Sequence, residues 1–159
     1  MGFSLTGTII VAVILTPNML MLLAPPKNMP EGMKDKGAIF TVLERIGQAG
    51  CFVLPVISKG WFEGRGANVW FILAALCAAV YWCLWIRYAV RRDFALLFSP
   101  LGFISIPMAV FPVLAFALLA VWGAHVWLGA AAALLAAGHF VNSWHTYKLI
   151  SGSPASREA

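Results

Sequence analysis

Three polar side chains that are able to do chemistry lie inside a long apolar stretch at residues 38–58. They are Glu44, Arg45 and Gln48. A charged side chain in the hydrocarbon core of a membrane costs roughly 2.5–3.5 kcal/mol on insertion scales. Such a residue is retained where it contacts a ligand, an ion or a proton, or where its hydrogen bonds hold helices together. The sequence leaves both interpretations of Glu44 open.

Glu44 shares a helix face with other residues that suit the interior of a bundle. Gln48, Cys51 and Pro55 follow it at helical spacing. Because a carboxylate cannot remain ionised against lipid, this face is expected to point inward. Arg45 points about 100° away around the helix, so it cannot pair well with Glu44. Glu44 therefore needs a partner from another helix.

The composition is that of an integral membrane protein. Of 159 residues, 62% are hydrophobic and 11% charged, whereas soluble domains average about 45–50% apolar and about 25% charged. In a membrane protein the net charge of +5 indicates orientation and contact with anionic headgroups, so no nucleic-acid partner is predicted. Cys51, Cys77 and Cys83 lie in apolar runs without metal or redox spacing and are expected to be inert.

Five segments have about the 20 residues that one crossing needs, and these are residues 2–24, 38–58, 67–90, 101–122 and 125–149. The last two form one apolar run interrupted by Gly123 and Ala124, between Trp122 and Trp127. Small residues and flanking tryptophans predict a tight hairpin at a membrane surface.

The predicted fold is an all-α bundle of five transmembrane helices in one domain, residues 1–150. A short flexible cytoplasmic tail is expected at 151–159. The proline- and glycine-rich loop at 25–37 is expected to form an ordered turn or a flexible lid.

The distribution of basic residues predicts the topology. Five crossings place only Lys59 and Arg65 on one side of the membrane, and on the other side Lys27, Lys34, Lys36, Arg87, Arg91, Arg92, Lys148 and Arg157. Four crossings would leave nearly equal charge on the two sides. Because Lys and Arg accumulate in cytoplasmic loops, we expect five crossings of a bacterial cytoplasmic membrane. The N-terminus is then outside and the C-terminus in the cytoplasm.

Polar side chains from four predicted helices fall in one layer near the cytoplasmic ends. A rise of ~1.5 Å per residue puts Glu44 roughly 9–10 Å from the end of its helix. Its expected partners at that depth are Arg87, His145 or Asn142, with His139 nearer the midplane. The candidate ligand-binding residues are therefore Glu44, Arg45, Gln48, Asn18, Arg87, His139, Asn142 and His145.

The alternatives for these residues are structural. Glu44 would then only join helices, and Arg45 would extend its long side chain to the membrane surface, toward Asp93 in a later loop. Gly129 and Ala133 have the small-xxx-small spacing that permits close helix approach or a homo-oligomer.

No metal site is predicted, and haem is the one cofactor alternative retained. His125 and His139 are about four turns apart on one helix, which suits two stacked haems. Their axial ligation would require methionines or a second copy of the chain. Zinc would have to gather Glu44 with His139 or His145 across helices without a motif.

No catalytic signature is present. Size and predicted helix number are similar to those of the tryptophan-rich translocator proteins, whose Trp/Pro-rich motifs have no counterpart here. The favoured function is binding or transport of a small amphiphilic or lipid-like ligand, with its polar head at Glu44, Arg45 and His145. One alternative is a membrane-embedded enzyme that uses Glu44 and His145 as acid and base on a lipid. Another is an accessory structural subunit of a membrane complex.

Overall fold

The computed structural model describes residues 2–28 and 37–151, and within them the regular structure is helical, with two isolated bridges besides. The first predicted helix is divided into α1 (Leu5–Leu15), the 3-10 turn η1 (Thr16–Met19) and α2 (Leu20–Leu23). The other elements are α3 (Ala38–Ile57), α4 (Lys59–Phe62), α5 (Val69–Arg91), η2 (Phe94–Leu97), α6 (Pro107–Gly123) and α7 (Val126–Ser151).

The described part of the chain has the helices of a multi-pass membrane protein. Four segments are apolar and long enough to span a bilayer, namely Leu5–Leu23, α3, α5 and α7. Helix α6 is apolar but has only 17 residues. Most of the predicted loop at 25–37 and of the tail at 151–159 lies outside the described residues.

The fourth helix begins at Pro107, six residues later than the predicted start at Leu101. Leu101 and Ile104 instead exchange backbone hydrogen bonds across a turn in which Gly102 has a φ of +58°. Pro107 then occupies the first helical turn, where its missing N–H leaves no helical hydrogen bond unmade. The sequence did not predict this turn because its residues are as apolar as those of a spanning helix.

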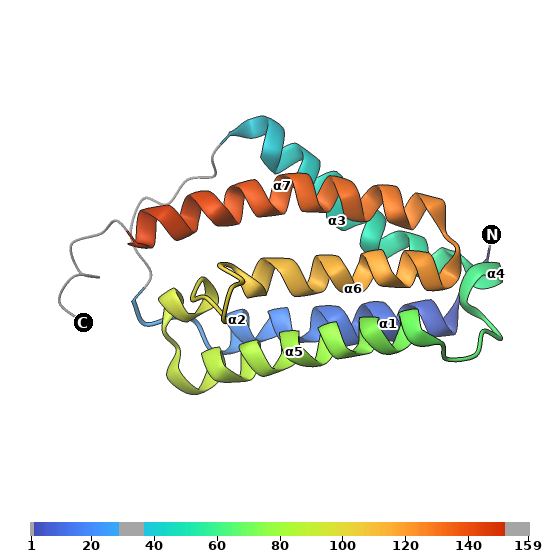
Figure 1. The fold of residues 1–159 in the computed structure, drawn as a ribbon, viewed down its shortest axis with the longest axis horizontal. Helices are drawn as coiled ribbons and strands as arrows, with labels where there is room; N and C mark the ends of the chain where they lie inside the picture. The colour runs from blue at the N-terminus through green and yellow to red at the C-terminus, as the bar shows by residue number, and fades with distance from the viewer. Residues whose placement is uncertain (1, 29–36, 152–159) are drawn as a thin grey trace.

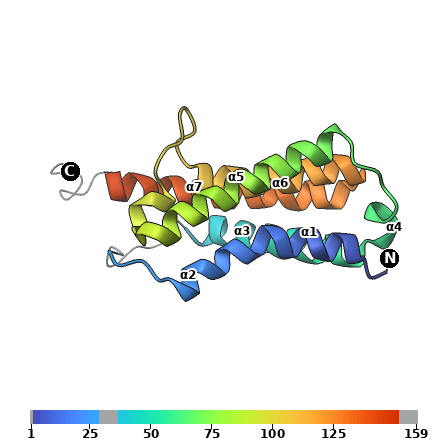
Figure 2. The ribbon, with the colours of Figure 1, turned by 90° about the horizontal axis from the view of Figure 1, so that it is seen from below.

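The five long helical segments form a closed ring. Around the ring, α1 contacts α3, α3 contacts α7, α7 contacts α6, and α6 contacts α5. The ring is closed by η1 and α2, which follow α1 in the chain and contact α5. Figure 1 shows α3 and α7 on one side of the bundle with α6 between them and the α1–α5 pair. Figure 2, turned by 90°, shows α1 in front of α3, and the two helices meet where Gly7 of α1 lies against Pro55 of α3.

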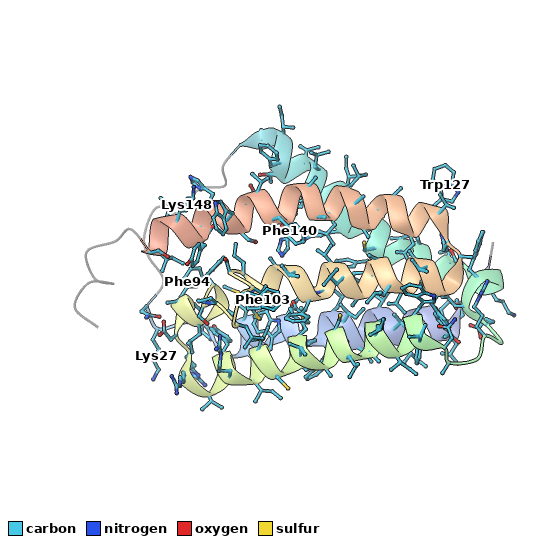
Figure 3. All side chains as sticks on the ribbon, in the orientation of Figure 1. Lys27, Phe94, Phe103, Trp127, Phe140 and Lys148 are labelled. Atoms are coloured by element: carbon cyan, nitrogen blue, oxygen red, sulfur yellow. The ribbon has the colours of Figure 1, made fainter. Side chains whose placement is uncertain are left out.

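Successive helices run in opposite directions, so their ends meet at two poles. At one pole the Gly2 N–H donates to the Ile57 carbonyl, 2.9 Å away, and the Lys59 N–H to the Gly2 carbonyl. At the other, the Tyr88 hydroxyl donates to the Ala24 carbonyl at 2.8 Å. Figure 3 labels Lys27 and Lys148 near this second pole and Trp127 at the first. We call these poles the Trp127 end and the Lys148 end.

The predicted hairpin at Gly123 and Ala124 is confirmed. Helix α6 ends at Gly123, Ala124 takes a left-handed φ of 50°, and α7 starts at Val126. His125 caps α7 because its Nδ1 accepts from the Leu128 N–H at 3.2 Å. Its Nε2 must then carry the hydrogen that is donated to Ser58 Oγ at 2.8 Å. Burial lowers the pKa of His125, in keeping with this neutral tautomer.

Glu63 closes the same end of the bundle by capping α1. Its carboxylate accepts hydrogen bonds from the Thr6 N–H and hydroxyl, both at 3.1 Å, and from the Ser4 hydroxyl at 2.9 Å. The backbone hydrogen bond from Thr6, followed by that of the Ser4 hydroxyl, lowers the pKa of Glu63. A carboxylate at a helix N-terminus also complements the helix dipole.

Helices α3 and α7 make the most extensive helix–helix contact in the described structure, and glycines on both helices bring their backbones close together. A Cβ at Gly138 would lie 2.7 Å from Glu44 Cβ and nearer still to the Glu44 amide and the Phe40 carbonyl. A Cβ at Gly50 would lie 2.6 Å from Ala131 Cβ, and Gly47 lies against the Leu135 backbone. Small residues permit such backbone contact where lipid removes any hydrophobic drive between helices.

We predict that Gly138→Ala lowers the free energy of unfolding by about 1–3 kcal/mol, since the added methyl group would force α3 and α7 apart. Gly129→Ala is the matched control on the same helix, because its Cβ would meet only Ala120 Cβ at 3.8 Å. That variant should be neutral or gain up to about 1 kcal/mol from helix propensity. Thermal unfolding in detergent micelles measures both. Equal stability of the two variants would contradict the close approach.

Candidate functional site

Glu44 forms the centre of a polar cluster between α3 and α7. Its Oε1 lies 2.7 Å from His139 Nδ1, and its Oε2 accepts a 2.7 Å hydrogen bond from Asn142 Nδ2. His139 and Asn142 are three residues apart on α7 and so share a face. Both oxygens of the carboxylate are thus satisfied, as a group withdrawn from water requires.

The predicted partners of Glu44 are partly right. Asn142 is confirmed, whereas Arg87 and His145 are wrong, and His139 takes the place they were expected to fill. His139 was expected nearer the midplane than Glu44, and yet the two side chains are in contact, because depth along each helix says nothing of how two helices cross. The spacing of His139 and Asn142 on one helix face was the sequence signal that identifies the pair.

The hydrogen bond to Glu44 orients the His139 ring. Because a carboxylate accepts, Nδ1 carries the hydrogen, and Nε2 is left without a partner among the described residues. The His139 side chain is 28% exposed and that of Glu44 17%. His139 lines a cavity, and Glu44 is not among the lining residues. The carboxylate therefore acts on the cavity through the imidazole.

The cavity has a volume of about 500 Å³ and lies within the ring of helices. Every long helical segment contributes to its wall: for example Leu15, Phe52, Tyr81, Pro112 and Leu135 come from α1, α3, α5, α6 and α7. The η2 turn and the start of α6 complete the wall toward the Lys148 end. This volume lies within the range of small-molecule binding sites.

The wall is mostly apolar and aromatic, with a limited set of polar groups. The aromatic side chains are Phe52, Tyr81, Trp85, Phe94, Phe98 and Phe116. The polar side chains besides the tyrosine and tryptophan are Asn18, Gln48, His139, Ser143 and Thr146. The Tyr81 hydroxyl donates to Asn18 Oδ1, which joins α5 to η1. Among the described residues that line this cavity, none is Lys, Arg, Asp or Glu.

The remaining candidates do not line the cavity. Arg87 donates to the Leu96 carbonyl at 3.0 Å and to the Ser99 hydroxyl, so it holds the η2 segment against α5. Arg45 is exposed on α3. Its suggested partner Asp93 instead accepts from Asn28 Nδ2 at 2.8 Å and caps η2. His145 has a buried Nδ1 without a hydrogen-bond partner in the described part of the chain.

No group of three or more His, Cys, Asp or Glu side chains gathers as a metal site among residues 2–28 and 37–151. The two histidines considered as haem ligands have protein partners, since His125 bonds Ser58 and His139 bonds Glu44. Cys51 is buried, Cys77 is partly buried and Cys83 is exposed.

Comparisons with protein-family models, with curated proteins and with solved structures found no match to this chain.

We predict that Glu44→Ala lowers the free energy of unfolding in micelles by about 1–3 kcal/mol, because it leaves partly buried donors of His139 and Asn142 unpaired. The neighbouring exposed Arg45→Ala should change stability by no more than about 0.5 kcal/mol. Chemical or thermal unfolding measured by circular dichroism tests both. Equal losses in the two variants would contradict the assigned cluster.

Proposed function

We propose that the protein crosses a bacterial cytoplasmic membrane five times and binds a small amphiphilic or lipid-like ligand in the cavity. The alternating direction of the helices supports five crossings. Helix α6 would span about 26 Å, slightly less than the hydrocarbon thickness of ~30 Å. A local mismatch of this size costs little.

The charges at the two poles support an orientation with the N-terminus outside. Lys27, Arg91, Arg92 and Lys148 belong to the Lys148 end, whereas Lys59 and Arg65 follow α3 at the Trp127 end. Basic residues concentrate on the cytoplasmic side. The cavity, whose wall includes η2 and the start of α6, then lies in the cytoplasmic half of the bundle.

The observation that carries the ligand proposal is the cavity itself, in which an apolar, aromatic wall surrounds a few convergent polar groups. This is the usual construction of a small-molecule site. The aromatic side chains suit an apolar body, and His139, Gln48 and Asn18 suit a polar head. We therefore assign the polar head of the ligand to His139. From the sequence it was expected at Glu44, Arg45 and His145.

The His139–Glu44 pair also favours a second candidate, a membrane-embedded enzyme. A histidine held by a carboxylate at Nδ1 is able to accept a proton at Nε2 from a substrate in the cavity. His139 takes the role that His145 had in the sequence-based alternative. A purely structural accessory subunit would need the cluster but not the cavity.

The orientation is tested by cysteine labelling in a background without Cys51, Cys77 and Cys83. Gly66→Cys, in the loop between α4 and α5, should react with a membrane-impermeant maleimide in intact spheroplasts. Phe103→Cys, at a fully exposed loop position (97%), should react only after the membrane is opened. The opposite pattern, or equal labelling of both, would contradict the proposed topology.

The ligand proposal is tested by native mass spectrometry of protein extracted from its membrane. We expect a bound amphiphile that Ala109→Phe removes, because the added ring fills the cavity that Ala109 lines. Ala137→Phe is the matched control, since Ala137 is exposed on α7 away from the cavity wall. Circular dichroism should show both variants folded.

An adduct retained equally by wild type and Ala109→Phe would mean that the lipid binds elsewhere and would overturn the proposal. Absence of any adduct from the wild type, together with unchanged stability on adding membrane lipid extract, would favour the accessory-subunit alternative. Turnover of an added lipid that is lost in His139→Gln would favour the enzyme.

A further inference from the structure

The electrostatic character of the cavity follows from one carboxylate. Glu44 is the one acidic residue in the five long helical segments of the described chain. It is separated from the cavity by the His139 ring, which it contacts at 2.7 Å. Because the described residues of the cavity wall include no Lys or Arg, none of these lining side chains neutralises the carboxylate for a ligand.

The charge of the Glu44–His139 pair depends on one proton. With a hydrogen at Nδ1 alone the pair carries a net negative charge, and a second hydrogen at Nε2 makes the pair neutral. A net charge is costly in a medium of low dielectric. The form without the Nε2 hydrogen is therefore the one whose negative charge a cation in the cavity would balance.

The aromatic lining of the cavity suits an organic cation. Six aromatic side chains line the cavity, and their π faces attract a desolvated organic cation. The groups that face Glu44 from α7 are His139 and Asn142, and on its own helix Arg45 is the neighbouring charge. Arg45 is exposed, and Arg87 is bound to Leu96 and Ser99. Neither places its charge in the wall.

We propose that the ligand of this cavity carries a lipophilic cationic group, such as a quaternary or protonated amine, and that its binding expels one proton from the Glu44–His139 pair. This inference rests on the proposed function and names the ligand class. The proton leaves Nε2 of His139 for water, and the positive charge of the ligand replaces it. No covalent bond to the ligand forms or breaks. The cavity thus exchanges a proton for an organic cation.

The test uses tetraphenylphosphonium and tetraphenylborate, two probes of similar size and opposite charge, with the full-length protein in detergent micelles. We expect the phosphonium to bind and to release up to one proton per bound cation in weakly buffered solution. Its affinity should rise with pH, since deprotonation of the pair is coupled to binding. The borate should bind more weakly and release no proton.

Glu44→Gln retains the size of the side chain and most of its hydrogen bonds but removes the charge. We expect it to weaken phosphonium binding about tenfold or more, because the negative charge that attracts the cation is removed. It should also abolish proton release and flatten the pH dependence. Glu63→Gln is the matched control, because Glu63 caps α1 outside the cavity wall, and it should behave as wild type.

Phosphonium binding without proton release in the wild type, or equal affinity in wild type and Glu44→Gln, would overturn the exchange. The wild-type proton measurement decides this even if Glu44→Gln does not fold. If both probes bind equally and Ala109→Phe weakens both, the cavity is a ligand site but not a cation site. If neither probe binds, the cation inference fails. The proposed function is then decided separately, by whether Ala109→Phe loses the native adduct seen in mass spectrometry.

Discussion

Helices α3 and α7 approach so closely at Gly138 that a methyl group there would overlap the Glu44 backbone. In a membrane this contact depends on small residues and hydrogen bonds, because lipid offers no hydrophobic drive for helix association. The same approach brings the Glu44 carboxylate to His139 and Asn142, which satisfy both of its oxygens. A bulkier residue at Gly138 would separate the helices and leave a carboxylate unpaired. Backbone packing and charge burial therefore depend on each other.

The cavity is a consequence of how the other helices meet this α3–α7 pair. Helix α7 also contacts α6, and the ring closes through α5 and the segment at Pro17. Because α6 starts only at Pro107, the wall toward the Lys148 end is completed by the η2 turn, including Phe94 and Phe98. Arg87 holds η2 against α5 and contributes no charge to the cavity. A large aromatic wall with one histidine results.

The two poles of the bundle use their polar groups differently. At the Trp127 end, Glu63 caps α1 and His125 caps α7 while bonding Ser58, so these groups are consumed by the connections between helices. In the other half, His139 has one nitrogen bound to Glu44 and lines a cavity with the other free of any described protein partner. A titratable group that still has an unpaired hydrogen-bonding atom is able to act on a ligand.

The sequence by itself determined the helical class, the apolar spans and the hairpin at Gly123, because length, hydropathy and small residues act locally. It also singled out Glu44 and Asn142, since buried polar groups need partners. The start of α6 was misplaced because the turn before Pro107 is as apolar as a helix. Only the tertiary structure decided that His139 is the partner of Glu44 and that a cavity lies beside it. Which faces meet depends on helix crossing and on glycine contacts between distant residues, and neither follows from depth along a single helix.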